Sequence, residues 1–129
     1  MINQAFKKIL VADDEAEALA SLSNILERAN YKVISTSKGK EVVDLAMRLK
    51  PDLIILDIVM PDMEGSEIAS ILVRKDSTAN IPIIFLTGII SREEEETVES
   101  RTGRHYVLAK PATPKELLEM VSKALSTPA

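Results

Sequence analysis

The sequence predicts an α/β fold in which a parallel β-sheet is covered by helices on both faces. Continuous apolar runs at 53–56 and 83–86 lack the alternation of half-exposed strands, which is typical of strands buried on both faces. Each predicted strand is followed by a predicted helix, and this pattern occurs five times. Such regular alternation implies right-handed crossovers within one parallel sheet.

The composition is that of one ordinary domain with an aliphatic core, since 46% of the 129 residues are hydrophobic and only 3% are aromatic. The chain has no cysteine and one histidine, which excludes disulfides, thiolate nucleophiles and metal centres built from several histidines. A net charge of −4 argues against binding to nucleic acid. No secretion signal is evident and the most apolar window, 81–90, is too short to span a bilayer, so we expect no membrane insertion and a cytoplasmic location.

The first half of the chain carries two strand–helix pairs. The apolar run 9–12 is the first strand, and leucines at helical spacing predict a helix over 14–29 that Asn30 closes. Residues 31–36 alternate polar and apolar side chains, as expected for a strand at the edge of the sheet. A further apolar stripe predicts a helix over 42–49, which a proline terminates.

The third and fourth pairs follow directly. The run 53–57 is a buried strand that ends in a carboxylate, and a proline stops the strand before Gly65 opens the next helix. The fourth strand covers 81–87. The segment 91–100 contains four consecutive glutamates and one large apolar residue, so it is predicted to be a helix with few apolar contacts to hold it in place.

The fifth pair closes the pattern. We expect a loop over 101–105 with the lone histidine at its end, a strand over 106–109 and a helix over 114–126. Thr113 and Glu116 form a predicted capping box at the start of that helix, and a proline occupies its first position.

Polar residues of definite kinds follow four of the predicted strands: Asp13 and Asp14, Asp57, Thr87 and Lys110. Because the strands are parallel, these residues are expected at one edge of the sheet, where ligands bind in open α/β folds. Three carboxylates brought together repel one another, and a hard cation such as Mg²⁺ relieves that repulsion. A carboxylate nucleophile with a metal ion, an ammonium and a hydroxyl suits phosphoryl transfer, in which the phosphoryl oxygens must be neutralised during in-line attack.

Each of these residues alone has an ordinary structural explanation. Asp13 and Asp14 could cap a helix, and Asp57 could stand in a turn. Thr87 could be a β-branched strand residue, and Lys110 could be a solvated strand end. Their joint occurrence at four strand ends favours a functional site.

At these positions the chain resembles the receiver domain of two-component response regulators. The matching motifs are Asp13-Asp14, the segment 56–65 (LDIVMPDMEG), Thr87 and Lys110-Pro111. The resemblance covers about residues 8–126, so we expect a single receiver domain over 1–129 with short tails and no output domain within it. It implies a flavodoxin-like (βα)5 fold, a doubly wound parallel sheet with strand order 2-1-3-4-5.

The resemblance also implies roles for individual residues. Asp57 would accept a phosphoryl group from a histidine kinase or a phosphotransfer protein. The family's Mg²⁺ site would consist of Asp13, Asp14, Asp57 and the carbonyl of Val59. Thr87 matches the hydroxyl that responds to phosphorylation, and Lys110 matches the lysine that contacts the phosphoryl group. The Lys110–Pro111 bond is expected to be cis.

The chain departs from the family pattern at two places. An aromatic residue usually stands three residues before the lysine, where this chain has Val107, and Tyr106 should point to the opposite face of the sheet. Val59 and Ile89 are apolar where relatives that hydrolyse their own phosphate quickly carry polar groups. We therefore expect slow dephosphorylation and a switch that uses loop and helix displacement more than a change of aromatic rotamer.

The predicted function is signal transduction by a receiver domain, with no catalysis beyond its own phosphorylation and dephosphorylation. Two alternatives stay open: a phosphatase or phosphotransferase that uses an aspartyl-phosphate on a related fold, or a receiver-like module that is never phosphorylated. The chain could be a stand-alone regulator, a relay intermediate or part of a larger protein. We expect an output partner or a second copy of the chain to bind the face made by 91–100, 106–109 and 114–126.

Overall fold

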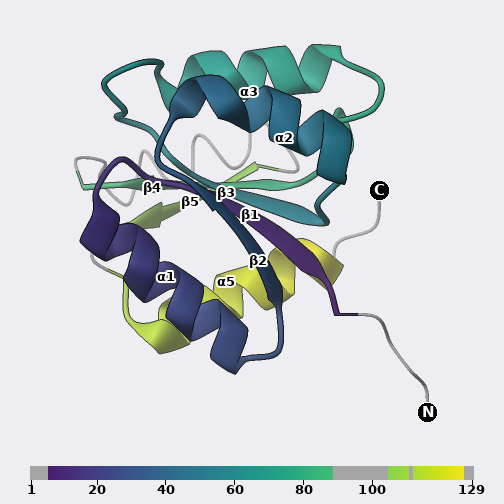
Figure 1. The fold of residues 1–129 in the computed structure, drawn as a ribbon. Helices are drawn as coiled ribbons and strands as arrows, with labels where there is room; N and C mark the ends of the chain where they lie inside the picture. The colour runs from purple at the N-terminus through teal and green to yellow at the C-terminus, as the bar shows by residue number, and fades with distance from the viewer. Residues whose placement is uncertain (1–5, 89–104, 111, 127–129) are drawn as a thin grey trace.

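The computed structural model describes residues 6–88, 105–110 and 112–126, which form a parallel five-stranded sheet between two layers of helices (Figure 1). The strand order is β2-β1-β3-β4-β5, which confirms the predicted order. The elements are β1 (Lys8–Ala12), α1 (Ala16–Arg28), β2 (Lys32–Thr36), the short 3-10 helix η1 (Gly39–Glu41), α2 (Val42–Leu49), β3 (Leu53–Asp57), α3 (Gly65–Arg74), β4 (Ile83–Thr87), β5 (His105–Ala109) and α5 (Pro114–Ser126).

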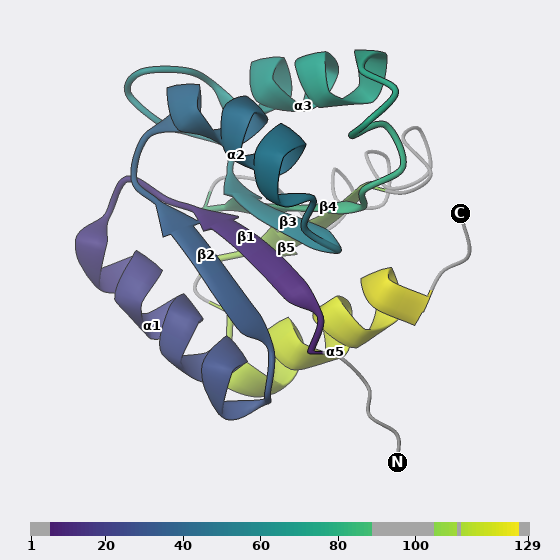
Figure 2. The same ribbon diagram turned by 45° about the vertical axis from the view of Figure 1, so that its right-hand side comes forward.

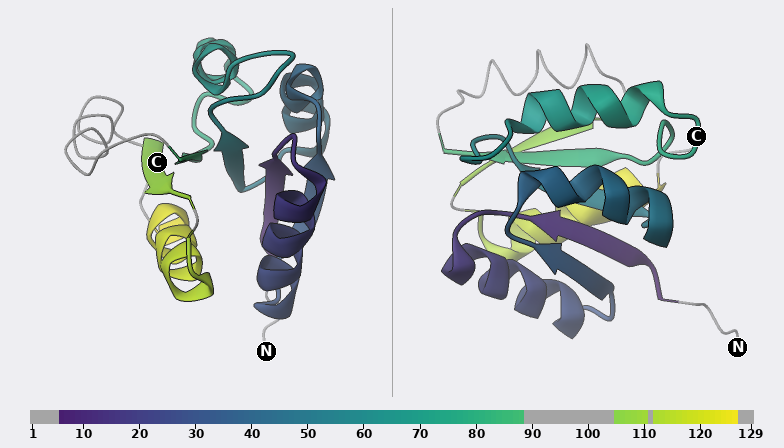
Figure 3. Two further views of the ribbon diagram at one scale, coloured as in Figure 1. Left: turned by 90° about the vertical axis from the view of Figure 1, so that its left-hand side faces the viewer. Right: turned by 45° about the horizontal axis from the view of Figure 1, so that its top comes forward.

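Helices cover both faces of the sheet. Figures 1 and 2 show α2 and α3 on one face and α1 and α5 on the other, and the end-on view in Figure 3 separates the two layers. Alternate residues of each strand point to opposite faces of the sheet. In β1, Leu10 and Ala12 pack with α2 and α3, whereas Ile9 and Val11 pack with α1. The predicted doubly wound architecture is therefore present, with a separate aliphatic core on each face.

The central strand is β3, and all five of its residues are buried. It pairs with β1 on one side and with β4 on the other, which explains its continuous apolar sequence. By contrast β2 lies at the sheet edge and is only partly buried, as its alternating sequence predicts.

Helix ends agree with the predictions to within two residues. α1 begins at Ala16 rather than at residue 14, because Asp13 Oδ1 instead accepts a hydrogen bond from the Glu15 N–H (3.0 Å). The helix is closed by Asn30, which adopts a positive φ of 73°. At α5 the capping box is formed, since the Glu116 N–H donates to Thr113 Oγ1 (3.1 Å) and the Thr113 N–H donates to Glu116 Oε1 (2.9 Å).

Several strand starts differ from the predictions by one or two residues. β4 begins at Ile83 and not at residue 81, because the Ile81 N–H bonds to the Thr78 carbonyl and Pro82 has no N–H to donate.

His105 was expected in a loop but is the first residue of β5, paired in register with Ile83 and only 8% exposed. Its ring meets Phe85 edge-on at 5.7 Å, so the aromatic contact and the strand pairing extend β5 by one residue. The expected helix 91–100, the rest of the expected loop 101–105, and Pro111 lie outside the described residues.

The loop from β3 to α3 returns on itself within a short distance. The Gly65 N–H donates to the Ile58 carbonyl (2.8 Å), and a Cβ at Gly65 would lie 2.8 Å from Ile58 Cα and 2.9 Å from the Asp57 carbonyl oxygen. Glycine is therefore required for the close approach. Met60 is buried in the core under α2 and α3 and Met63 packs against that core, which anchors the middle of the loop.

No helix among the described residues is long and apolar enough to cross a membrane.

Candidate functional site

The register of the sheet brings the predicted strand-end residues to one edge. Ala12 pairs with Leu56, so Asp13 follows at the level of Asp57. In the other half of the sheet, beyond β3, Thr87 pairs with Ala109, the residue before Lys110. Asp13, Asp57 and Thr87 are all buried, with exposed fractions of 0%, 5% and 4%. Polar residues at this depth need partners, and the strand ends supply several of them.

Three carboxylates converge at this edge, and we call Asp13, Asp14 and Asp57 the acid cluster. One oxygen from each lies within 4.8 Å of the others. Asp14 is exposed whereas the other two are buried, so the cluster opens to solvent on one side. Carboxylate oxygens at this spacing fit a hard divalent cation such as Mg²⁺, which also keeps several water ligands.

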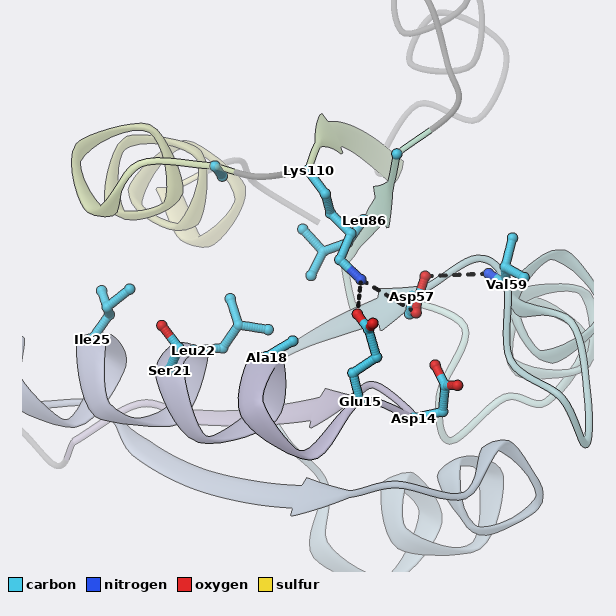
Figure 4. A pocket seen from close by; sticks show the side chains of 12 residues that line it. Asp14, Glu15, Ala18, Ser21, Leu22, Ile25, Asp57, Val59, Leu86 and Lys110 are labelled. Carbon is cyan, nitrogen blue, oxygen red and sulfur yellow. Dashed lines mark hydrogen bonds and ion pairs between the residues drawn. The ribbon is translucent and has the colours of Figure 1, made fainter.

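Lys110 brings a positive charge to the same place. Its Nζ lies 3.1 Å from Asp13 Oδ2 and 3.5 Å from Asp57 Oδ2. It also lies 3.6 Å from Oε1 of Glu15, which reaches over from the start of α1 (Figure 4). The lysine is three-quarters buried, so in this structure it partly neutralises the acid cluster at short range.

Burial and neighbouring charge shift the ionisation of this pair. Burial raises the pKa of Asp57 above its ordinary value, the Lys110 ammonium opposes that rise, and the charge of Asp13 adds to it. Burial alone would lower the pKa of Lys110, but the hydrogen bond and charge of Asp13, together with Asp57, raise it instead. Lys110 therefore stays cationic at neutral pH, while burial disfavours the charged form of Asp57.

The remaining predicted residues lie close by in the fold. Thr87 ends β4, and its carbonyl accepts a hydrogen bond from the Lys110 N–H (2.8 Å). The Val59 N–H donates to Asp57 Oδ1 (3.2 Å) and so fixes one oxygen of that carboxylate. The Val59 side chain is 59% exposed, so an apolar group stands at the mouth of the site.

The site opens into a groove of about 680 Å³, which we call the α1 groove. Apolar residues of α1, together with Leu86 and Ala112, form most of its wall beyond the charged end (Figure 4). Its lining residues are Asp14, Glu15, Ala18, Ser21, Leu22, Ile25, Asp57, Val59, Leu86, Gly88, Lys110 and Ala112. The carboxylate of Asp57 can thus be reached from the surface through the mostly apolar α1 groove.

The tyrosine of β5 lies on the face that strand alternation predicts. Tyr106 packs in the core with α5, and its ring lies 5.6 Å from the Lys123 ammonium. Val107 packs in the opposite core with Phe85. Tyr106 is therefore on the other side of the sheet from the position at which the family usually has an aromatic residue.

Two contacts at the site were not predicted. Glu15 pairs with Lys110, and Asp62 in the β3–α3 loop binds backbone N–H groups of η1. Both side chains belong to exposed segments, and their partners are 95 and 22–23 residues away, so no local pattern reveals them. An acid directly after Asp13-Asp14 was the one available sign of the first contact.

The fold and these strand ends can be compared with known proteins. The family model described as the response regulator receiver domain matches residues 9–122. The chain belongs to the response regulator receiver family. It is thus a signal-transduction domain of the phosphorelay type, as its sequence motifs predict.

Relatives of this receiver domain include longer proteins. It is 35% identical over 119 residues to the alkaline phosphatase synthesis transcriptional regulatory protein PhoP of Bacillus subtilis, covering 92% of this chain and 48% of that protein. It is 33% identical over 130 residues to a protein-glutamate methylesterase/protein-glutamine glutaminase of Archaeoglobus fulgidus, covering 93% of this chain and 36% of the relative. The receiver chain therefore spans between about a third and a half of these two relatives.

A solved structure matches most of the receiver domain. The chemotaxis response regulator CheY4 of Vibrio cholerae superposes with a TM-score of 0.84 at 29% identity, covering 94% of this chain and 100% of CheY4. At this identity the match supports both the fold and the family.

Proposed function

We propose that Asp57 is the phosphoryl acceptor of this receiver domain. The observation that carries the proposal is the position of its carboxylate, which is buried at the end of the central strand with the Lys110 ammonium 3.5 Å away. Asp13 is also buried, at 0% exposed, but it does not line the α1 groove. Asp57 does line the groove, so a donor can approach it.

The chemistry follows from the groups around this carboxylate. An oxygen of Asp57 attacks phosphorus in line, a new O–P bond forms, and the P–N bond of a phosphohistidine breaks with its electron pair returning to the imidazole nitrogen. Lys110 turns from the acid cluster toward the incoming oxygens and contributes positive charge. Val59, through its N–H, holds the other carboxylate oxygen in place.

We also propose that the acid cluster is a Mg²⁺ site. Asp13, Asp14 and Asp57 would each supply one oxygen, and the carbonyl of Val59 is the expected fourth protein ligand. When bound, the ion would neutralise the cluster and the phosphoryl oxygens during transfer. That role explains why three acids are gathered where one lysine cannot balance them.

The donor would be a histidine kinase or a phosphotransfer protein that docks along the α1 groove. The groove joins an apolar wall to the acceptor carboxylate, which suits a protein surface that presents a phosphohistidine beside apolar side chains. The output partner, or a second copy of the chain, would use the face of β5 and α5, where Leu108, Glu116, Glu119, Met120 and Lys123 line a hollow of about 250 Å³.

The chain would act as a switch and not as an enzyme with turnover. The residue two positions past Asp57 is Val59, which has neither the second acid of aspartyl-phosphate phosphatases nor a polar group to orient water. Its exposed apolar side chain would shield the phosphoryl group, so we expect a long-lived phosphoprotein.

The test is to incubate the protein with Mg²⁺ and a small phosphodonor such as acetyl phosphate, then to measure its intact mass and map the adduct. Wild type should gain one phosphoryl group at Asp57, and Asp57→Asn should gain none while keeping its fold. Asp44→Asn, which removes an exposed acid of α2, is the matched control and should behave as wild type. A phosphoryl group found on Asp13 or Asp14 of wild type would refute the assignment.

A further inference from the structure

A single carboxylate ties the β3–α3 loop to the segment that follows β2. Asp62 Oδ1 accepts a hydrogen bond from the Gly39 N–H (3.0 Å), and Asp62 Oδ2 accepts one from the Lys40 N–H (3.0 Å). Both oxygens of the carboxylate are therefore used, and both donors are backbone groups at the start of η1. We call this bidentate contact the Asp62 clamp.

The clamp is closely fitted. A Cβ at Gly39 would lie 3.1 Å from Asp62 Oδ1, 3.1 Å from Ile68 Cδ1 and 3.1 Å from the Met63 carbonyl oxygen. Gly39 thus allows the loop, the start of α3 and η1 to meet at a distance that a larger residue would disturb. The hydrogen bond from Lys40 leads the causes that lower the pKa of Asp62, so the carboxylate stays ionised and accepts both bonds across the neutral range.

The clamp acts on the loop that carries the acceptor site. Asp57 and Val59 lie at one end of this loop, where the Val59 N–H bonds to the Asp57 carboxylate. The other end is closed by the bond from the Gly65 N–H to the Ile58 carbonyl. Between them Met60 is buried in the core, and Asp62 provides a tie to a different connection of the fold. The part of the loop nearest the site is thus held from both sides.

We propose that Asp62 is a positioning residue, which acts through the clamp to hold the β3–α3 loop in the conformation that the acceptor site requires. The residue does not touch the reacting atoms; it limits the movement of the backbone at Val59. The inference rests on the proposed function in one respect: it expects Mg²⁺ affinity to depend on the position of the Val59 backbone.

The test compares Asp62→Ala and Asp62→Asn with wild type in the full chain, first by amide hydrogen exchange without metal. Loss of a charge-assisted bond should speed exchange of the Val59 amide about tenfold relative to the Ile55 amide in β3, which reports on general stability. In Asp62→Asn one acceptor oxygen remains, so its effect should be about half as large on a logarithmic scale.

The second readout is Mg²⁺ affinity, titrated by calorimetry. Asp62→Ala should weaken binding about fivefold, below the usual range for groups that contact a metal ligand directly. Gly39→Ala should act in the same direction, and the double variant should be no worse than the more affected single variant, because both changes break one contact. Asp44→Asn removes the same charge from the exposed side of α2 and should leave both readouts unchanged.

The proposal is overturned if the relative exchange rate of Val59 in Asp62→Ala stays within about twofold of wild type, a change that charge-assisted bonding would exceed. It is equally overturned if Asp44→Asn weakens Mg²⁺ binding as much as Asp62→Ala does, since the effect would then be one of net charge. The exchange result is independent of phosphorylation. A wild-type protein that takes up neither Mg²⁺ nor a phosphoryl group would refute the proposed function, while Val59 exchange would still decide the role of Asp62.

Discussion

At the scale of single residues, the charge on Asp57 works against folding. Its carboxylate is buried beside Asp13, and its pKa is raised by that burial despite the Lys110 ammonium. Asp57→Asn keeps the shape and removes the charge, so we expect it to stabilise the unmodified protein at neutral pH. Urea denaturation of the two proteins without Mg²⁺ measures the difference, and a less stable variant would contradict the argument.

The same residue predicts a pH dependence. Because the pKa of Asp57 is raised, the folded protein holds this proton to a higher pH than the unfolded chain, and the contribution of Asp57 to stability falls as pH rises through its folded pKa. The advantage of Asp57→Asn should therefore be small near the ordinary carboxyl value of 3.8 and should grow as pH rises through the folded pKa of Asp57. An advantage that is constant with pH would exclude ionisation as its cause.

Residues at strand ends could be predicted from the sequence, and exposed acids in loops could not. Asp57 and Lys110 each follow an apolar run, so parallel pairing alone brings them together. The contacts of Glu15 and Asp62 depend on the path of a loop and on a side-chain rotamer, which periodicity does not report. The contacts of Glu15 and Asp62 are visible only in the folded structure.

At the scale of elements, the start of α3 depends on Gly65. Gly65→Ala would gain about 1 kcal/mol of helix propensity, but its Cβ would lie under 3.0 Å from backbone atoms of Asp57 and Ile58. Backbone cannot move aside cheaply, so we expect a net loss of about 2 kcal/mol in the free energy of unfolding. Gly88→Ala is the control, since nothing lies within 4 Å of its Cβ position, and thermal denaturation should separate the two variants.

Element boundaries were predictable where apolar periodicity or a cap marks them. The capping box of α5 and the proline and glycine around β3 gave their positions to the residue. His105 was misplaced because a histidine at a strand end carries no apolar signal, and its contact with Phe85 is a tertiary one. The late start of α1 has a similar cause, the use of Asp13 as a local acceptor for Glu15.

At the scale of the whole molecule, Mg²⁺ should stabilise the fold by binding the acid cluster. An ion at ten times its Kd adds about 1.4 kcal/mol to the free energy of unfolding if the unfolded chain does not bind it. Asp14→Ala removes the exposed oxygen of the cluster and should abolish most of this gain while leaving the metal-free stability nearly unchanged. Thermal melts with and without Mg²⁺, and with a chelator, measure both quantities. An equal gain in Asp14→Ala would place the ion elsewhere.

The sequence alone implied one parallel sheet with helices on both faces, because strand and helix alternate throughout. It did not determine which strands are neighbours; the order 2-1-3-4-5 came from the resemblance to a family, and the structure confirms it. The reason is physical: alternation marks β2 as an edge strand, but β1, β3 and β4 are all apolar enough to lie beside one another, so their neighbours are selected by the connecting helices and by packing.

The backbone hydrogen bond from Lys110 to Thr87 has one more consequence. It continues the ladder between β4 and β5 one residue beyond the paired strands, so the two strand ends are mechanically joined. A backbone shift of either residue toward Asp57 should therefore be passed to the other through this bond of 2.8 Å. Thr87 and Lys110 should thus respond to phosphorylation together, so that the ends of β4 and β5 move as one unit.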